Sequence, residues 1–294
     1  MNLEEKKILL IGYKGILGSE LKELLPEKSL ELGDVNSDVS SNEFVDITNY
    51  QDLKNKIDKS NPDIVINCAA YTQVDLAESE AEKCFSINTL GVINLVKALE
   101  GKKAKLVHVS SDYVFGSLEN VSSPISELQE PNPCGVYGFS KFLADQYILQ
   151  QKELKSLIIR TSWLHGKTGP NFIKSIVKAA KSNKTIKVVN DQFGSPTWVP
   201  WLAKIITDLL SKDANGIFNV SSKGSISWHE FAKEIVEKSG IDCEVNTQST
   251  EQLARPAKRP KYSVLDKSKL ESFLSIECIS WQECVTEHLR HSKI

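Results

Sequence analysis

The chain has 294 residues, of which 40% are hydrophobic and 25% are charged, a globular composition that excludes a mainly disordered protein. Its 36 basic and 38 acidic residues leave a net charge of −2, so no excess positive charge is available to bind nucleic acid. No apolar run approaches the roughly 20 residues that span a bilayer, and residues 1–7 match neither a signal nor a transit peptide. The six cysteines form no CxxC pair, so we expect reduced thiols and a cytoplasmic protein.

Short apolar runs alternate with helical patterns in the first half of the chain. Strands are predicted at residues 8–11, 63–67, 105–109 and 156–160, and helices at 19–25, 78–99 and 137–151. Apolar strands that alternate with helices are typical of a parallel sheet covered on both faces. We therefore predict an α/β fold, a Rossmann-like doubly wound parallel sheet with right-handed crossovers.

This alternation loosens after Trp163. Helices are predicted at 171–182, 201–211 and 227–237, and strands at 186–189 and 216–220. We expect residues 1–163 to form a dinucleotide-binding Rossmann domain that residues 191–222 complete. The remaining ranges would form a smaller, interleaved C-terminal substrate-binding lobe, at residues 164–190 and 223–294.

The first predicted strand runs directly into a glycine-rich segment, Gly12-Tyr-Lys-Gly15-Ile-Leu-Gly18. Glycines at this spacing allow a tight turn, let the backbone approach a pyrophosphate and let the helix pack close to the strand. The free N–H groups of the helix N-terminus then favour the bound anion. This position between strand and helix predicts a dinucleotide site, with Gly12, Gly15, Ile16, Leu17 and Gly18 as cofactor-binding residues.

Two residues separate the first two glycines, a spacing that resembles the short-chain dehydrogenase/reductases. That resemblance implies a serine after a later strand and a Tyr-x-x-x-Lys motif on the next helix. Ser111 follows the strand predicted at 105–109, and Tyr137 and Lys141 come next with the required spacing. Tyr50 also has a lysine four residues later, but no serine-bearing strand precedes it, so we expect no catalytic role there.

The chemistry of this set is consistent with its spacing. Residues four apart lie on one helical face, so Lys141 is expected beside Tyr137. A free phenol has a pKa of about 10, and a nearby ammonium would lower the pKa of Tyr137 and make it a proton donor near neutrality. Ser111 would donate a hydrogen bond to the substrate carbonyl oxygen. We predict Ser111, Tyr137 and Lys141 as catalytic residues, with Tyr137 and Lys141 also contacting the cofactor.

Further blocks resemble the dTDP-4-dehydrorhamnose reductases, a family of extended short-chain dehydrogenase/reductases. They lie in the same order along residues 7–270, at 67–80, 111–115, 160–163, 169–172, 191–197, 227–232 and 259–266. The resemblance implies an NAD(P)H-dependent oxidoreductase. Its reaction would reduce the 4-keto group of dTDP-6-deoxy-L-lyxo-4-hexulose (dTDP-4-dehydrorhamnose) to give dTDP-L-rhamnose, a precursor of cell-surface polysaccharide.

The same resemblance implies the other binding residues. For the cofactor these are Asp46 and Ile47 at the adenine and Ala69 and Ala70 near the ribose. For the sugar nucleotide they are Tyr113, Trp163, Asn171 and Arg259. The indole of Trp163 suits a deoxysugar ring, and its alternative role is a core position between the two lobes. The Arg259 guanidinium suits phosphate oxygens, a role for which other basic side chains compete, at Arg255, Lys258 and Lys261.

The sequence leaves NADPH and NADH both open as the cofactor. Asp34 lies where an acidic residue would accept a hydrogen bond from the ribose 2′-hydroxyl of NADH and would repel a 2′-phosphate. Lys14, inside the glycine loop, would attract that phosphate instead. Some family members carry magnesium on acidic residues at a dimer contact, and Glu20 matches one such position. The other positions have no assigned match, so we predict no metal site and leave a homodimer open.

Three alternatives accompany this interpretation. One is a reductase of another nucleotide-linked 4-keto-6-deoxysugar. A second is a dehydratase or epimerase, but dehydratases carry Asp-Glu after the catalytic serine or threonine, and here Tyr113 follows Asp112. The third is a non-catalytic NADP-binding regulatory subunit of the same superfamily, against which the retained Ser111, Tyr137 and Lys141 argue.

Overall fold

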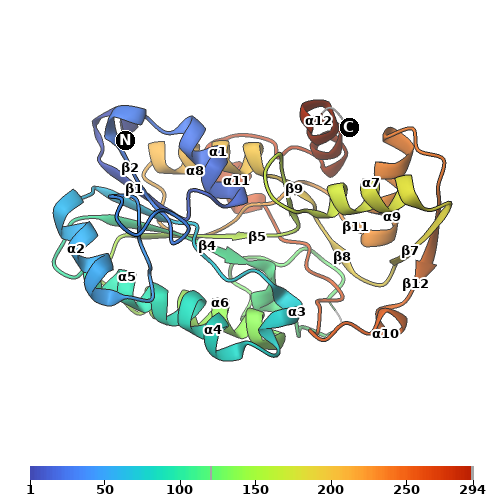
Figure 1. Ribbon diagram of the computed structural model, residues 1–294, viewed down its shortest axis with the longest axis horizontal. Helices are drawn as coiled ribbons and strands as arrows, with labels where there is room; N and C mark the ends of the chain where they lie inside the picture. The colour runs from blue at the N-terminus through green and yellow to red at the C-terminus, as the bar shows by residue number, and fades with distance from the viewer. Residues whose placement is uncertain (120, 293–294) are drawn as a thin grey trace.

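Six parallel strands form the central sheet, in the order β10-β5-β4-β3-β1-β2 (Figure 1). The computed structural model describes residues 1–119 and 121–292. The strands are β1 (Ile8–Ile11), β2 (Leu30–Gly33), β3 (Ile64–Asn67), β4 (Lys105–Ser111), β5 (Ser156–Thr161) and β10 (Gly216–Asn219). The predicted α/β fold with a doubly wound parallel sheet is confirmed.

The strand order changes direction at β1. The chain runs from β1 outward to β2 and then returns to β3 on the other side of β1. The register pairs Ile11 with both Gly33 and Asn67, so these three strands end at the same level. In open α/β sheets, ligands bind in the crevice outside the carboxyl ends of the strands at such a point.

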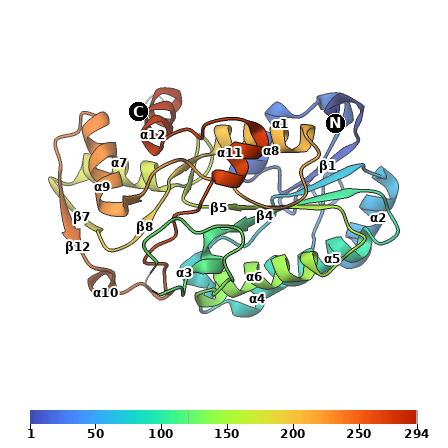
Figure 2. The same ribbon diagram turned by 180° about the vertical axis from the view of Figure 1, so that it is seen from behind.

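Helices cover both faces of the sheet (Figures 1 and 2). One face carries α1 (Ile16–Leu24), α8 (Val199–Ser211) and α11 (Ser268–Leu274). The other carries α2 (Tyr50–Ser60), α4 (Ala81–Phe85), α5 (Gly91–Ala98) and α6 (Gly135–Leu149), with the short α3 (Val74–Ala77) before α4. The helix predicted at 78–99 is interrupted, because a π-helical turn, η3 (Ser86–Leu90), lies between α4 and α5.

The two faces account for the unbroken apolar sequence of the strands. Ile8 and Leu10 of β1 pack in the core that includes Leu202 of α8. Leu9 and Ile11 point the other way, into the core beneath α2 and α5. Side chains of a strand alternate between faces, so a strand buried on both sides is apolar at every position.

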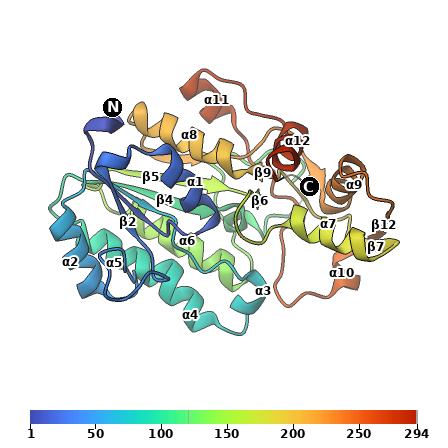
Figure 3. The ribbon, with the colours of Figure 1, turned by 45° about the horizontal axis from the view of Figure 1, so that its top comes forward.

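A second lobe lies at the end of the molecule away from β2 (Figure 3). Its helices are α7 (Phe172–Ser182), α9 (Trp228–Lys238), α10 (Thr250–Leu253) and α12 (Trp281–Ser292). Its strands form three pairs, β7 (Thr185–Val189) with β12 (Glu244–Gln248), β8 (Phe193–Gly194) with β11 (Ile226–Ser227), and β6 (Leu164–His165) with β9 (Thr197–Trp198). Short 3₁₀ turns complete the elements, at η1 (Leu3–Glu5), η2 (Glu27–Ser29) and η4 (Asp112–Phe115).

The two lobes are interleaved along the chain. Strand β10 returns to the main sheet after the first part of the second lobe. Leu270 and Leu274 of α11 also lie in the core of the main sheet, although they fall in the range expected for the second lobe. The division at residues 163, 190 and 222 therefore stays a prediction. Among the described residues, none of the helices is long and apolar enough to cross a membrane.

Candidate active site

Two adjoining cavities lie outside the carboxyl ends of the central strands. The first has a volume of about 690 Å³ and the second about 860 Å³. Gly15, Cys68 and Ala70 line both, so the cavities meet where β1 and β3 end. Each volume is in the range typical of small-molecule sites.

The glycine loop forms the wall between β1 and α1. Gly12 has a φ of +80°, and a Cβ there would lie 2.5 Å from the Ala69 nitrogen. A Cβ on Gly18 would collide with the Gly12 backbone, which lets α1 pack close to the strand. Within the described residues no side chain caps α1 at Gly15, and Ile16, Leu17 and Gly18 line the second cavity. This uncapped N-terminus, reached only because the glycines lack side chains, fits a pyrophosphate group.

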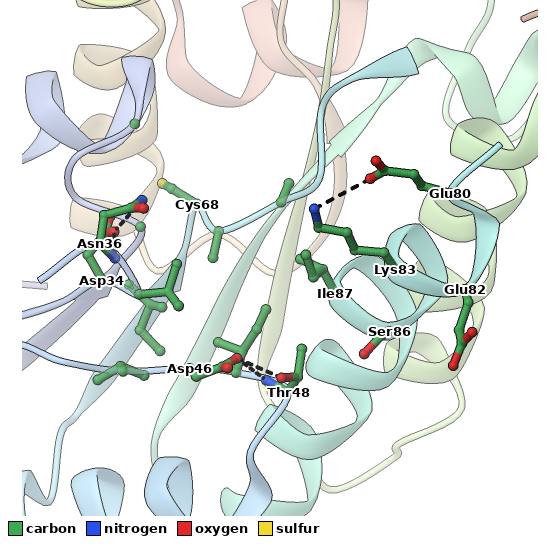
Figure 4. A pocket seen from close by; sticks show the side chains of 18 of the residues that line it. Asp34, Asn36, Asp46, Thr48, Cys68, Glu80, Glu82, Lys83, Ser86 and Ile87 are labelled. Atoms are coloured by element: carbon green, nitrogen blue, oxygen red, sulfur yellow. Dashed lines mark hydrogen bonds and ion pairs between the residues drawn. The ribbon is translucent and has the colours of Figure 1, made fainter. Parts of the chain in front are cut away.

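The far end of the first cavity is lined by Asp34, Asn36, Asp46 and Thr48 (Figure 4). The Asp34 carboxylate accepts hydrogen bonds from the Asn36 N–H at 2.8 Å, from Asn36 Nδ2 at 3.0 Å and from the Lys14 N–H at 3.0 Å. The Lys14 ammonium donates to the Asn36 carbonyl at 2.9 Å, so it lies beside this end of the cavity. Three protein donors thus occupy most of the roughly four acceptor positions of Asp34.

The remaining cofactor residues predicted from the resemblance also line the first cavity. Asp46, Ile47, Ala69 and Ala70 do so together with Gly12 and Gly15. Asp46 Oδ1 accepts from the Thr48 N–H at 2.9 Å and from its hydroxyl at 2.7 Å, which fixes the carboxylate at the cavity wall (Figure 4). The structure therefore brings together the predicted cofactor residues, which the chain supplies from separate loops.

The predicted catalytic residues Ser111, Tyr137 and Lys141 all line the second cavity. Lys141 is buried, and its ammonium donates to the Val109 carbonyl at 2.7 Å. Ser111, at the end of β4, donates from its hydroxyl to Asp112 Oδ1 at 3.0 Å and accepts from the Tyr113 N–H at 3.2 Å. The rings of Tyr113 and Tyr137 meet edge to face, with centroids 5.3 Å apart.

Burial controls the protonation of these groups. Burial raises the pKa of Tyr137, and the Ser111 hydroxyl acts in the opposite direction. The pKa of Tyr137 is therefore raised and not lowered as expected, because the cost of burying a phenolate dominates. Burial lowers the pKa of Lys141 to about 8, against the attraction of Asp145. Burial also raises the pKa of Asp112 to about 6.

The predicted substrate residues fall into two groups. Tyr113, Trp163 and Arg259 line the second cavity. Trp163 has a φ of +47° and stacks on Trp228 with ring centroids 3.4 Å apart, so it contributes both to the cavity and to the packing between the lobes. Asn171 lines neither cavity, because its side chain caps α7 at the Lys174 N–H and donates to the Gly166 carbonyl.

Arg259 is held by an acidic partner. Its two terminal nitrogens each lie 2.9 Å from an oxygen of Asp75, and one of them also donates to the Ala257 carbonyl at 3.0 Å. This pairing lowers the pKa of Asp75. Among the described residues, these contacts use three of the five N–H donors of the guanidinium.

Several residues that line the second cavity were missed by the sequence analysis. Among them are Cys68, which directly follows β3, and a set from the second lobe, Phe172, Lys187, Gln192, Trp228 and Gln248. The position of Cys68 after a predicted strand was a usable signal. The others come from segments of the second lobe whose packing on the first lobe has no local sequence pattern.

The fold and this site together define the class of protein. A Rossmann-like sheet with a glycine loop after β1, and with serine, tyrosine and lysine at one cavity beyond β4, is that of an extended short-chain dehydrogenase/reductase. The profile of the family described as RmlD substrate binding domain matches residues 6–294. The chain belongs to the dTDP-4-dehydrorhamnose reductase family.

Individual relatives agree with this membership. A dTDP-4-dehydrorhamnose reductase of Salmonella typhimurium is 34% identical over 94% of each chain. The spore coat polysaccharide biosynthesis protein SpsK of Bacillus subtilis is 36% identical over 97% of each chain. A crystal structure of a dTDP-4-dehydrorhamnose reductase from Bacillus anthracis, in complex with NADP, has a TM-score of 0.89 and 34% identity, covering 97% of this chain and 99% of that one.

Proposed function

We propose that this chain catalyses the NADPH-dependent reduction of the 4-keto group of dTDP-4-dehydrorhamnose to give dTDP-L-rhamnose. The observation that carries the proposal is the position of Ser111, Tyr137 and Lys141 at one cavity that opens beside the glycine-loop cavity. Membership of the reductase family supports the choice of substrate.

The protein's part in the reaction is to orient the keto group and to supply a proton. The bound cofactor provides the hydride. Tyr137 donates its proton to the sugar oxygen as negative charge develops there. Ser111 donates a hydrogen bond to the same oxygen, for which its single hydroxyl proton turns from Asp112 Oδ1 to the substrate. Lys141 holds the cofactor's ribose and supplies the proton that restores Tyr137.

The binding residues follow from the two cavities. Gly12, Gly15 and the first turn of α1 would hold the cofactor pyrophosphate, and Asp46, Ile47, Ala69 and Ala70 would hold its adenosine end. In the second cavity, Trp163 and Tyr113 would enclose the sugar ring, and the N–H groups of Arg259 that Asp75 and Ala257 do not use would bind the diphosphate. We assign Asn171 to the capping of α7 and not to the substrate.

NADPH is the cofactor that we favour over NADH. Asp34 is largely occupied by protein donors, which leaves little acceptor capacity for a ribose 2′-hydroxyl. The Lys14 ammonium lies at the same end of the cavity and suits a 2′-phosphate. The NADP complex of the Bacillus anthracis relative supports this choice.

We further propose that the chain works in the cytoplasm as a homodimer. The six cysteines are free thiols, which suits a reducing compartment. Large apolar side chains are exposed on the neighbouring η3 and α6, at Leu90, Phe139 and Leu143. Light scattering would give twice the chain mass for the wild type and a smaller mass for Leu143→Lys. A monomeric wild type would contradict the dimer.

The test of the activity is NADPH consumption in the presence of dTDP-4-keto-6-deoxyglucose and a 3,5-epimerase. We expect consumption that depends on the epimerase, with dTDP-L-rhamnose as the product. Consumption only with another nucleotide-linked keto sugar would favour a different reductase. NADPH binding with no consumption on any such sugar would favour the non-catalytic regulatory subunit.

A further inference from the structure

A continuous line of hydrogen bonds runs behind the catalytic lysine. The Ala69 N–H donates to Asn67 Oδ1 at 3.1 Å, and Asn67 Nδ2 lies 3.3 Å from His108 Nδ1. His108 Nε2 lies 3.2 Å from Lys141 Nζ, which in turn donates to the Val109 carbonyl at 2.7 Å. Asn67, His108 and Lys141 are each only 1% exposed, so no bulk water competes for these partners.

The direction of this line follows from its first member. A backbone N–H only donates, so the Asn67 oxygen faces Ala69 and the Asn67 amide N–H faces His108 Nδ1. Burial and the nearby Lys141 hold the pKa of His108 well below its usual value, so the imidazole is neutral. A neutral imidazole has one donor and one acceptor nitrogen. Because Nδ1 is the acceptor, the proton of His108 is on Nε2 and faces Lys141.

This arrangement discriminates between the two protonation states of Lys141. An ammonium has three donors and no acceptor, whereas a neutral amine has a lone pair that accepts from the His108 Nε2–H. We propose that His108 is a positioning residue that favours the amine form of Lys141, so that the lysine readily gives its proton back to Tyr137 during turnover. The catalytic role of His108 in this inference rests on the proposed function, whereas the Nε2–H tautomer of His108 does not.

The proton transfer that His108 assists is balanced. After Tyr137 has given its proton to the sugar oxygen, an N–H bond of Lys141 breaks and the O–H bond of Tyr137 forms again. The lone pair left on Lys141 then accepts from His108. In the opposite case, an ammonium beside the Nε2–H would place two donors 3.2 Å apart with no acceptor between them.

Other groups around Lys141 do not provide this effect. The titratable groups that face it come from neighbouring elements, with Cys68 after β3, Cys84 on α4, His108 on β4, and Tyr137 and Asp145 on α6 itself. Burial raises the pKa of Cys68 to about 12 and also raises that of Cys84, so both stay neutral thiols. Asp145 favours the ammonium, but it is paired with Arg160 of β5. His108 is therefore the group whose orientation disfavours the positive charge of Lys141.

The direct test is ¹⁵N-histidine NMR of the full chain, which has five histidines. His108→Gln identifies the His108 signals by their loss. We expect the Nε2–H tautomer above about pH 8, where Lys141 is an amine, and a shift toward the Nδ1–H tautomer as Lys141 becomes charged at lower pH. An Nδ1–H tautomer across the whole range, or an imidazolium near neutral pH, would overturn the proposal.

A matched variant at the other end of the line tests the same idea with a second readout. In Asn67→Asp, the carboxylate accepts from both Ala69 N–H and His108 Nδ1–H, so the proton moves to Nδ1 and His108 Nε2 becomes an acceptor for the ammonium. We expect NADP⁺ affinity to change with pH as Lys141 titrates. The midpoint of that change should rise by about one pH unit in Asn67→Asp and in His108→Leu. A fall of the midpoint in His108→Leu would mean that the imidazole stabilises the ammonium, which contradicts the proposal.

Two features keep the outcomes separate. The tautomer of the wild type requires no variant, so a poorly folding Asn67→Asp, detected by circular dichroism, leaves the NMR result decisive. Neither readout requires turnover. A chain that shows the Nε2–H tautomer and the midpoint shift but reduces no keto sugar would refute the proposed function and leave the linkage between His108 and Lys141 in place.

Discussion

Arg160 of β5 and Asp145 of α6 form an ion pair that is completely buried, with Arg160 Nε 3.2 Å from Asp145 Oδ2. The guanidinium carbon also lies 4.9 Å from the centre of the Phe115 ring. Asp145 follows Lys141 by one helical turn, and Lys141 follows Tyr137 by another. The pair therefore anchors the catalytic face of α6 to the sheet.

Loss of one partner from this pair is expected to destabilise the chain strongly. Arg160→Leu leaves a buried carboxylate without its counter-charge, a change that costs about 3–5 kcal/mol in proteins. Urea unfolding should show this loss, whereas Lys204→Leu, which breaks the exposed pair with Asp208, should change stability by less than about 1 kcal/mol. Equal effects of the two substitutions would show that loss of the buried pair costs no more free energy of unfolding than loss of the exposed pair.

The glycine loop gives a prediction for cofactor binding. Gly15 has an ordinary backbone conformation, but a Cβ there would lie 3.2 Å from the Gly12 carbonyl, at the wall that both cavities share. Gly15→Val should weaken NADPH binding by about tenfold or more, because its side chain occupies the space where the backbone approaches the pyrophosphate. Calorimetry on the folded variant measures this, and an unchanged affinity would remove the loop from the cofactor site.

Cofactor preference should depend on Lys14. Lys14→Ala removes the ammonium beside Asn36 and should lower the affinity for NADPH by more than that for NADH. Asp34→Ala removes the remaining carboxylate repulsion and should shift the preference further toward NADPH. The measurement is the ratio of kcat/KM for the two cofactors. If the ratio is unchanged in both variants, neither residue determines the preference between NADPH and NADH.

A histidine pair in the second lobe should make stability depend on pH. His165 and His288 are buried with their Nδ1 atoms 3.1 Å apart. Burial lowers the pKa of His288 to about 4 and lowers that of His165 well below its usual value. Unfolded histidine titrates at about 6.5, so the unfolded chain binds protons first. The contribution of this neutral pair to the free energy of unfolding is fully present above about pH 6.5 and is lost as the pH falls through about 4.

His288→Phe should reduce this loss, as measured by the free energy of unfolding at about pH 7 and about pH 4.5. The exposed His291 gives a graded comparison, because it adds only a smaller part to the lowering of the pKa of His288, and His291→Gln should keep most of the pH dependence of the wild type. A His288→Phe variant that loses as much stability in acid as the wild type would assign the effect to other groups.

The sequence was sufficient for the features that depend on local pattern. The glycine spacing predicted a loop between the first strand and the first helix, and the loop lies between β1 and α1. The four-residue spacing of Tyr137 and Lys141 predicted one helical face, and both side chains line the same cavity from α6. The helix predicted at 227–237 is likewise present as α9, which begins with a capping box formed by Ser227 and Glu230.

Features that depend on tertiary contact were not predictable. Asn171 was expected to contact the substrate, but its side chain caps α7 and lines neither cavity. The partner of Arg259 is Asp75, far away in the chain, and nothing near either residue indicates the other. The raised pKa of Tyr137 reflects its burial in the folded chain, which the spacing of residues along α6 does not indicate.

The central claim is that Tyr137 is the proton donor, and Tyr137→Phe tests it most directly against Tyr50→Phe. Both tyrosines precede a lysine by four residues, but Tyr50 lies exposed at the start of α2. With the 4-keto sugar nucleotide as substrate, Tyr137→Phe should lower kcat by about a hundredfold or more while NADPH binding persists, and Tyr50→Phe should leave kcat unchanged. Near-normal turnover in Tyr137→Phe, or a larger loss in Tyr50→Phe, would contradict the account.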